Sequence, residues 1–328
     1  MKAYFVEYPA GPFAKVDLPR PEPGPGQVLV LVHASGVNPL DAKIRAGAAQ
    51  HAKHPLPAVL GLDMAGQVEE VGPGVSEFRP GDEVYGMVGG VGGIQGTLAE
   101  YVTANAALLA AKPKSLSMRE AAALPLVTIT AWEGICDRAR VGAGEKVLVH
   151  AGAGGVGYIA VQLARARGAK VYATVSSTKR AIAESVGATA IDYRELIPEQ
   201  YVLQHTQGDG FDVIYDTVGG TTIDASFAAV KRYTGRVVSC LGWSTHSLAP
   251  LSFRGASYSG VFSLIPLLTG KDQARHGQIL REAAALADAG KLRPLLNSQR
   301  FTPTDIAAAH ALVESGAAGK VVVEFVAS

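Results

Sequence analysis

The first third of the chain alternates short apolar runs with turn residues, a pattern that predicts β-strands. Gln27–Ala34 (QVLVLVHA) follows a turn rich in proline and glycine, Pro19–Gly26. Three further strand candidates are Ala65–Val71, Asp82–Tyr85 and Thr97–Thr103. Short strands separated by turn signals predict a barrel-like, mostly antiparallel domain.

The pattern changes near residue 117, after which strands and helices alternate. Ser117 and Glu120 have the spacing of a capping box, and apolar residues continue at helical spacing to Ala139. The elements predicted next are the strands Lys146–His150, Lys170–Val175, Phe211–Asp216 and Gly235–Leu241, and the helices Gly155–Arg167, Ser177–Val186, Gly220–Val230 and Asp272–Ala289. This alternation predicts a parallel sheet with helices on both faces.

The chain ends with a predicted helix, Pro303–Ser315, and a predicted strand, Lys320–Phe325. Nothing requires this strand to belong to the α/β unit, and it is free to return to the first domain. The predicted fold class is therefore α/β, with a doubly wound parallel sheet of the Rossmann type and a second, β-rich domain.

The most informative motif is His150–Gly157 (HAGAGGVG), in which three glycines satisfy G-x-G-x-x-G. The motif follows a predicted strand and opens a predicted helix, the context that a dinucleotide-binding turn requires. Residues without a Cβ let the diphosphate approach the N–H groups at the helix start. The alternative is a glycine-rich turn without a ligand. The predicted cofactor contacts here are Gly152, Gly154, Gly155, Val156 and Gly157.

The residues after the second strand of this unit favour NADP over NAD. A site for NAD carries Asp or Glu about 20 residues past the glycines, but no acid lies between Gly157 and Glu184. Instead the strand ends in hydroxyls and cations, and Ser176, Ser177 and Lys179 suit a 2′-phosphate. The alternative is a serine that caps a helix with a solvated basic face. Both can hold at once, and we expect NADPH to be preferred.

Composition narrows the possible partners. Lys plus Arg number 30 and Asp plus Glu 29, so the net charge of +1 gives no reason to expect nucleic acid. The longer uncharged stretches are interrupted by glycine, proline or serine, so no membrane partner is expected. The amino terminus lacks the apolar core of a signal peptide, and two cysteines exclude a disulfide framework. The expected location is the cytoplasm.

The chain resembles the medium-chain dehydrogenase/reductase superfamily, and within it the zinc-free NADPH quinone oxidoreductases. The resemblance covers nearly the whole chain and rests on Gly36–Asp41 (GVNPLD), Pro57–Gly66 (PAVLGLDMAG), Gly81–Tyr85 (GDEVY), Val147–Gly157 and Gly319–Val322 (GKVV). It implies a GroES-like domain over residues 1–122, a Rossmann NADP-binding domain over 123–292 and a return to the first domain over 293–328. It also implies an active site in the cleft between the domains.

The zinc alcohol dehydrogenases of this superfamily differ from this chain at the positions that bind zinc. Those relatives carry a zinc-ligating Cys where this chain has Asn38, and Gly-His-Glu where it has Gly61-Leu62-Asp63. They also carry a four-cysteine structural loop, which a chain with two cysteines lacks. Because the thiolate and imidazole donors are missing, we expect no zinc and assign no metal ligands.

Three residues are candidates for the catalytic step, in which hydride adds to an electron-poor acceptor and charge develops on its oxygen. The Asn38 amide can donate to that oxygen or to the nicotinamide ribose; the alternative is an Asn that holds the turn before Pro39. Lys43 stands where family members often have Tyr, and is a cationic donor or a solvated lysine. Tyr85 lines the cleft or packs in the core.

Six further residues are predicted to contact the cofactor. Thr130, Tyr193 and Lys320 match family positions near it; for Thr130 the alternative is a hydroxyl bonded to its own helix, and for Lys320 an exposed lysine. Leu241 and Gly242 end a strand where ligands gather. Phe262 matches the loop over the nicotinamide, with core packing as the alternative.

The expected function is an NADPH-dependent, zinc-independent reductase that transfers hydride to a small electrophile, either a quinone or an α,β-unsaturated carbonyl compound. A second hypothesis is an enoyl-thioester reductase of the same superfamily. A third, from another class, is a non-catalytic NADPH-binding or redox-sensing protein. Because relatives are commonly dimers, we expect a homodimer, with the strand Gly235–Leu241 and the segment Val261–Leu268 as candidates to extend a sheet between subunits.

Overall fold

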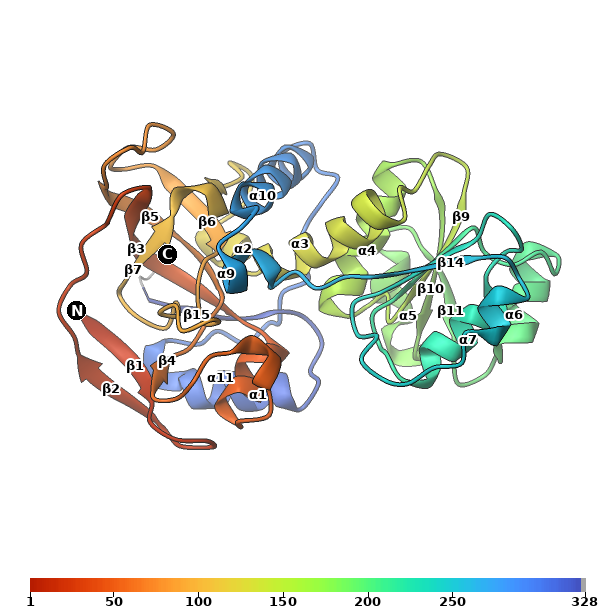
Figure 1. The fold of residues 1–328 in the computed structure, drawn as a ribbon, viewed down its shortest axis with the longest axis horizontal. Helices are drawn as coiled ribbons and strands as arrows, with labels where there is room; N and C mark the ends of the chain where they lie inside the picture. The colour runs from red at the N-terminus through yellow and green to blue at the C-terminus, as the bar shows by residue number, and fades with distance from the viewer. Residues whose placement is uncertain (326–328) are drawn as a thin grey trace. The chain divides into compact units, whose positions relative to one another are not determined.

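The strands of the first third pair into two antiparallel sheets, as their alternating pattern predicts (Figure 1). The computed structural model describes residues 1–325, and these sheets belong to a first compact unit formed by Met1–Ile129 and the chain from Leu264 onward. Its strands are β1 (Lys2–Val6), β2 (Phe13–Asp17), β3 (Gln27–Val37), β4 (Ala58–Val59), β5 (Asp63–Val71), β6 (Glu83–Met87), β7 (Tyr101–Asn105), β8 (Leu109–Ala111) and β15 (Val321–Glu324).

The larger sheet of unit 1 is built around β3. Its order is β15-β3-β5-β6-β8, with β7 also paired to β3. Val28, Leu29, Val30 and Val32 of β3 are almost completely buried, and their burial contributes to the hydrophobic stabilisation of this sheet. The carboxyl-terminal strand β15 pairs antiparallel with β3, so the end of the chain joins the sheet of its first third.

Helices cover unit 1. They are α1 (Pro39–Arg45), α2 (Met118–Ala122), α9 (Ile265–Thr269), α10 (Gln273–Asp288) and α11 (Ile306–Glu314), and α3 (Pro125–Trp132) runs across the boundary to unit 2. The capping box predicted at Ser117 is confirmed: its hydroxyl and amide face Glu120 at the start of α2. Figure 1 shows the red and blue ends of the chain together in this unit, and α11 packs against α1.

Helix α10 belongs to the β-rich unit 1 and not, as the alternation of strands and helices predicts, to the α/β unit. We expected Asp272–Ala289 within the α/β half, but α10 contacts β8 and β6 and is part of unit 1. Gly277 permits this packing, because a Cβ there would lie 2.4 Å from the carbonyl oxygen of Ala107. The helix therefore covers the β-rich sheet rather than the parallel one.

Unit 2, Thr130–Ser263, contains a six-stranded parallel sheet of the doubly wound type. The strand order β11-β10-β9-β12-β13-β14 is the Rossmann order. From β9 the chain adds strands first on one side of the sheet and then, from β12 on, on the other, so the strand order reverses between β9 and β12 while all strands stay parallel. The fold class predicted from the sequence is thus confirmed. The elements are β9 (Lys146–His150), α4 (Gly155–Ala166), β10 (Lys170–Val175), α5 (Arg180–Glu184), β11 (Thr189–Asp192), α6 (Pro198–Thr206), β12 (Val213–Asp216), α7 (Thr221–Ala229), β13 (Arg236–Ser239), α8 (Ala249–Ser252) and β14 (Ser257–Gly260), preceded by a π-helix (Glu133–Arg138).

The strand predicted at Gly235–Leu241 has two neighbours. It forms β13, which pairs with β12 on one side and β14 on the other. Both edges of β13 are therefore occupied, and our expectation that this strand extends the sheet to another subunit is wrong. The outer strand is β14, whose short sequence, SYSG, carries little of the apolar signal that identifies a strand.

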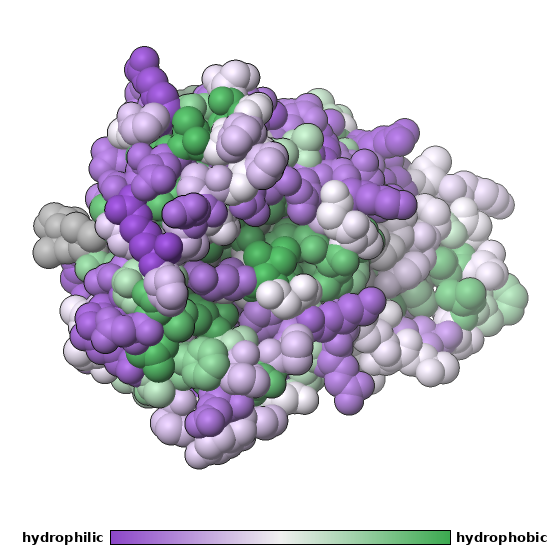
Figure 2. All heavy atoms as spheres, turned by 60° about the vertical axis from the view of Figure 1, so that its left-hand side comes forward, coloured by the Kyte–Doolittle hydropathy of each residue, from purple (hydrophilic) through white to green (hydrophobic). Residues whose placement is uncertain are grey.

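Within residues 1–325, no helix combines the length and the apolar character needed to cross a membrane. On the face seen in Figure 2, apolar areas are bordered by hydrophilic side chains.

Candidate functional site

The glycine-rich turn of unit 2 is too tight for side chains. The backbone of Ala151 has φ 52° directly after β9, and Gly154 is the N-cap of α4. A Cβ on Gly157 would lie 2.2 Å from the Ala151 carbonyl oxygen, and one on Gly152 would lie 2.4 Å from the Cβ of Ala173. The chain can pass from strand to helix here only because these positions are glycine.

This turn leaves backbone donors at the start of α4. The Gly154 N–H donates to the Ala151 carbonyl at 2.8 Å, and the helical ladder begins with the Tyr158 N–H, which donates to Gly154. The N–H groups of Gly155, Val156 and Gly157 lie between them, in the first turn, where an α-helix has no acceptor of its own. Together with the helix dipole they form a cradle for an anion such as a diphosphate.

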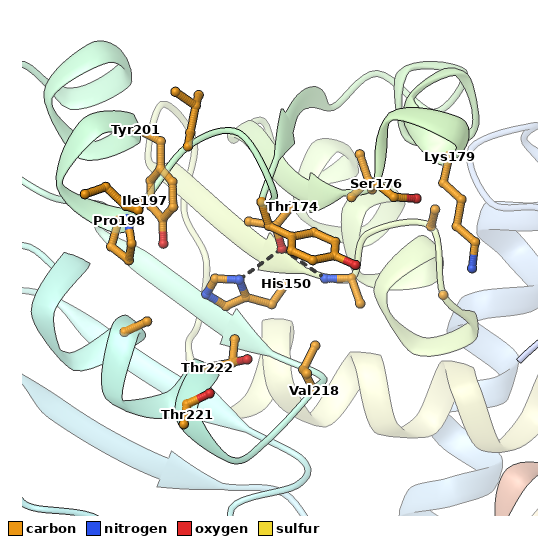
Figure 3. A pocket seen from close by; sticks show the side chains of 17 residues that line it. His150, Thr174, Ser176, Lys179, Ile197, Pro198, Tyr201, Val218, Thr221 and Thr222 are labelled. Atoms are coloured by element: carbon orange, nitrogen blue, oxygen red, sulfur yellow. Dashed lines mark hydrogen bonds between the residues drawn. The ribbon is translucent and has the colours of Figure 1, made fainter.

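A pocket of about 550 Å³ opens beside this turn, at the carboxyl ends of the parallel strands (Figure 3). It lies where the strand order reverses, the place at which open α/β sheets bind ligands. Of the residues predicted from the sequence, Gly154, Ser176, Lys179 and Tyr193 line it. Its remaining lining residues are His150, Ala151, Ala153, Thr174, Val175, Leu196, Ile197, Pro198, Tyr201, Val218, Thr221, Thr222 and Ala225.

The chemistry of this pocket suits an anionic, ring-bearing ligand. Lys179 supplies the positive charge, and the residues that line the pocket include no Asp or Glu. Ser176 Oγ lies 3.0 Å from Thr178 Oγ1, so hydroxyls gather at the end of β10. Ile197, Pro198 and Val218 provide apolar walls of the kind that hold a flat ring.

The other predicted cofactor residues lie outside this lining. Ser177 is exposed, Gly152 is buried under the turn, and Thr130 Oγ1 lies 3.0 Å from Ser263 Oγ. The Leu241 N–H donates to Ser239 Oγ, and Gly242 is so close to Tyr258 that a Cβ would lie 2.0 Å from its hydroxyl. Gly155, Val156, Gly157, Phe262 and Lys320 are likewise not among the residues that line it.

Unit 1 holds a buried polar cluster formed by Asn38, Asp41, Asp63 and Lys320. The Asn38 amide donates to Asp63 Oδ2 at 3.0 Å, and its oxygen accepts from the Lys320 ammonium. Lys320 Nζ also donates to the Val37 carbonyl at 3.2 Å and lies 3.7 Å from Asp63 Oδ2. Burial raises the pKa of Asp63 to about 6 and lowers that of Lys320.

These contacts bear on the three catalytic candidates. The side chain of Asn38 is 1% exposed, and both ends of its amide are engaged within the cluster. Tyr85 has no exposed surface, and its hydroxyl donates to the Leu280 carbonyl of α10 at 2.6 Å, so it packs in the core rather than lining a cleft. Lys43 is exposed on α1, as the solvated alternative has it.

Two protein families match this chain, one within unit 1 and one over parts of both units. The alcohol dehydrogenase GroES-like domain family matches residues 24–114, and the zinc-binding dehydrogenase family matches residues 186–323. A 2-methylene-furan-3-one reductase from Solanum lycopersicum is 36% identical over 306 residues, which are 90% of this chain and 71% of that protein. The chain belongs to the medium-chain dehydrogenase/reductase superfamily. It is an oxidoreductase of that superfamily.

Two further relatives lie in the branches expected from the sequence. An NADPH-dependent alkenal/one oxidoreductase, chloroplastic, from Arabidopsis thaliana is 36% identical over 316 residues, 92% of this chain and 73% of that protein. The structure of a quinone oxidoreductase from Coxiella burnetii is 32% identical, covers 99% of both chains and superimposes with a TM-score of 0.84. An alcohol dehydrogenase superfamily protein from Novosphingobium aromaticivorans is 53% identical, with 99% and 100% of the two chains covered and a TM-score of 0.97.

The buried cluster does not fit the zinc ion of the zinc-binding relatives. Asn38, Leu62 and Asp63 provide no thiolate or imidazole, the donors that bind zinc most strongly. The ammonium of Lys320 already neutralises the Asp63 carboxylate, and a divalent cation beside it would be repelled. By contrast, the glycine cradle and the pocket beside it fit a dinucleotide.

Two features of the site escaped the sequence analysis. His150 lines the pocket, although we had read it only as the residue before the glycines. Ile197, Pro198 and Tyr201 come from the start of α6, a helix that we did not predict. His150 could have been found, because it is the last residue of a predicted strand at a ligand-binding edge.

Proposed function

We propose that the protein is an NADP(H)-dependent reductase of α,β-unsaturated carbonyl compounds and quinones. The observation that carries the proposal is the strand–turn–helix cradle with an adjoining pocket that contains Lys179 and no acid. A carboxylate at the end of β10 would bind the ribose hydroxyls of NAD and repel a 2′-phosphate. The alkenal/one oxidoreductase and quinone oxidoreductase relatives support the acceptor class.

The residues divide the work of holding the cofactor. The N–H groups of Gly155, Val156 and Gly157 would hold its diphosphate, and Lys179 and Ser176 would bind the 2′-phosphate. Bound NADPH supplies the hydride that adds to the electron-poor carbon of the acceptor. Tyr193, 55% exposed beside Arg194, stays a candidate to cover the adenosine.

We also propose that the reaction proceeds without zinc. Its support is the chemistry of Asn38, Asp63 and Lys320, whose side chains include no thiolate or imidazole and are already engaged with one another. Asn38 stays a candidate to stabilise the negative charge that develops on the acceptor oxygen, which requires that a ligand displace one of its present partners, and Lys320 stays a candidate cofactor contact.

The experiment is a panel of acceptors followed by NADPH consumption. It includes a simple enone, a 2-alkenal, 1,2-naphthoquinone and an enoyl thioester, each with NADPH and NADH, before and after chelation. We expect turnover of the first three with NADPH, a lower kcat/KM with NADH and no loss on chelation. A higher kcat/KM for the enoyl thioester than for the other acceptors would identify the protein as an enoyl-thioester reductase instead. NADPH binding without turnover of any acceptor would favour a non-catalytic role.

The proposal includes a homodimer in the cytoplasm. Among residues 1–325 the outer strand β14 pairs with β13 alone, which leaves its other edge available in unit 2, with Tyr258 37% exposed on it. Sedimentation equilibrium tests the dimer: a species of twice the 34.0 kDa chain mass is expected. A monomer at micromolar concentration would contradict this part alone.

A further inference from the structure

His150 is a buried histidine at the carboxyl end of β9 with one ring nitrogen unused. It is 3% exposed, and its ring lies in the pocket between Thr174 of β10 and Thr222 of α7 (Figure 3). Nδ1 lies 3.0 Å from Thr174 Oγ1. Nε2 has no hydrogen-bond partner among residues 1–325, although buried polar atoms of this kind are normally paired.

The hydrogen bonds of Thr174 favour one tautomer of this ring. Thr174 Oγ1 accepts from the Ala151 N–H at 3.2 Å, and its single hydrogen is best used by donating to His150 Nδ1. Burial lowers the pKa of His150 to about 4, so the ring is neutral and carries one proton. In the favoured tautomer that proton resides on Nε2, a donor without an acceptor among residues 1–325.

The surroundings of Nε2 indicate the kind of acceptor. Besides Thr174, the pocket that holds the ring is lined by Pro198, Tyr201, Val218 and Thr222, of which Tyr201 and Thr222 carry hydroxyls (Figure 3). A charged phosphate would find Lys179 at the other side of the pocket, where Figure 3 shows it apart from His150. Largely apolar walls that carry a few buried polar groups suit a flat nitrogen heterocycle and its attached sugar.

We propose that His150 is a cofactor-binding residue whose Nε2–H donates to an acceptor atom of the adenosine half of the dinucleotide, and that Thr174 is the positioning residue that keeps this hydrogen on Nε2. The inference rests on the proposed function, because it requires that the pocket bind a dinucleotide. It adds a neutral, buried donor to the contacts by which the adenosine is recognised.

Binding of the two halves of the cofactor tests the proposal. Titration calorimetry with adenosine 2′,5′-bisphosphate and with reduced nicotinamide mononucleotide compares the wild type with His150→Leu, His150→Gln and Thr174→Val. Loss of one hydrogen bond to a neutral group predicts about tenfold weaker binding of the adenosine fragment by His150→Leu. The nicotinamide fragment should bind as in the wild type, and the KM for NADPH should rise while kcat at saturation is kept.

The other variants separate a hydrogen bond from a packing effect. His150→Gln restores a nitrogen donor and should recover most of the affinity, whereas Thr174→Val should weaken binding by about threefold, since both tautomers are then populated. Equal affinity of His150→Leu and wild type for the adenosine fragment would overturn the proposal. Parallel loss of both fragments would overturn the assignment to the adenosine half.

A measurement on the unmodified protein does not depend on the folding of variants. Long-range ¹H–¹⁵N spectra of the imidazole groups should show His150 with the proton on Nε2, and its exchange with water should slow when the adenosine fragment binds. A proton on Nδ1 would refute the inference. If the wild type binds neither fragment nor NADPH, it is the proposed function that fails.

Discussion

The ammonium of Lys320 and the carboxylate of Asp63 lie 3.7 Å apart inside unit 1, with side chains 8% and 0% exposed. Lys320 directly precedes β15 and Asp63 begins β5, so the pair links the two chain segments that form unit 1. Because both charges are removed from water, each depends on the other and on Asn38 to offset its desolvation.

Removing the cation alone should be strongly destabilising. Lys320→Met leaves Asp63 and Asp41 buried without a positive charge, and we expect a loss of about 3–5 kcal/mol in the free energy of unfolding. The double variant Lys320→Met/Asp63→Asn also removes one carboxylate and should recover at least half of that loss. Urea denaturation at pH 7.5 measures both. A double variant no more stable than Lys320→Met would show that the two charges are not coupled.

The fold could be predicted where its signals are local. Lys146–His150 and Lys170–Val175 were predicted with the bounds that β9 and β10 have, because continuous apolar runs bounded by turns identify buried strands. The assignment of α10 failed because an amphipathic helical pattern does not specify which sheet the helix covers. Its contacts with unit 1, such as the close approach of Gly277 to the Ala107 carbonyl oxygen and the hydrogen bond from Tyr85 to Leu280, join residues far apart in the sequence.

The same distinction holds for the site. The glycine turn and Lys179 could be singled out from the sequence because a candidate dinucleotide-binding motif consists of a few consecutive residues, and the structure places Gly154 and Lys179 at one pocket. Asn38 and Tyr85 could not be judged in this way, because their partners Lys320 and Leu280 are 282 and 195 residues away along the chain. Whether an amide is available to a ligand or engaged internally depends on such distant contacts.

Lys179 should decide between the two nicotinamide cofactors. A charge-assisted hydrogen bond to phosphate contributes about 1.5–3 kcal/mol, so Lys179→Ala should raise the KM for NADPH by about 10- to 100-fold. The KM for NADH, which has no 2′-phosphate, should change less than threefold. Steady-state kinetics with both cofactors measures the ratio.

The neighbouring cation provides the matched control. Arg180 lies 3.5 Å from Glu184 and donates to the Ala190 carbonyl, and it does not line the pocket. Arg180→Ala should therefore leave the preference for NADPH within twofold of the wild type. If both substitutions reduced NADPH use equally, general positive charge rather than a specific contact would be responsible.

His276 should make the protein sensitive to acid. It is fully buried in α10, neither ring nitrogen has a partner within residues 1–325, and burial lowers its pKa from 6.5 to about 4. Between these values the unfolded chain binds the proton and the folded one does not, so stability falls as pH drops from 6.5 to 4. The shift corresponds to about 3 kcal/mol over that window.

Replacing His276 tests the sign. His276→Leu should flatten the dependence of the unfolding free energy on pH below 6.5, while its effect at pH 7.5 is only that of packing. Asp41→Asn should remove a pH dependence of the opposite sign. Burial raises the pKa of Asp41 to about 7, so in the wild type this carboxyl lowers the free energy of unfolding as pH rises from about 4 to 7. Urea midpoints at several pH values compare the three proteins. Parallel curves for His276→Leu and wild type would contradict the assignment.

Replacing Gly157 tests whether the glycine turn holds the diphosphate of the cofactor. In Gly157→Ala the new Cβ would lie 2.2 Å from the Ala151 carbonyl oxygen, so the turn must open and its N–H groups must move. We expect a loss of about 1–3 kcal/mol of stability and at least tenfold weaker NADPH binding, measured by thermal melting and fluorescence titration. Gly260→Ala is the control, because a Cβ there meets no atom within 4 Å. NADPH affinity of Gly157→Ala equal to that of Gly260→Ala would mean that the cofactor does not bind at this turn.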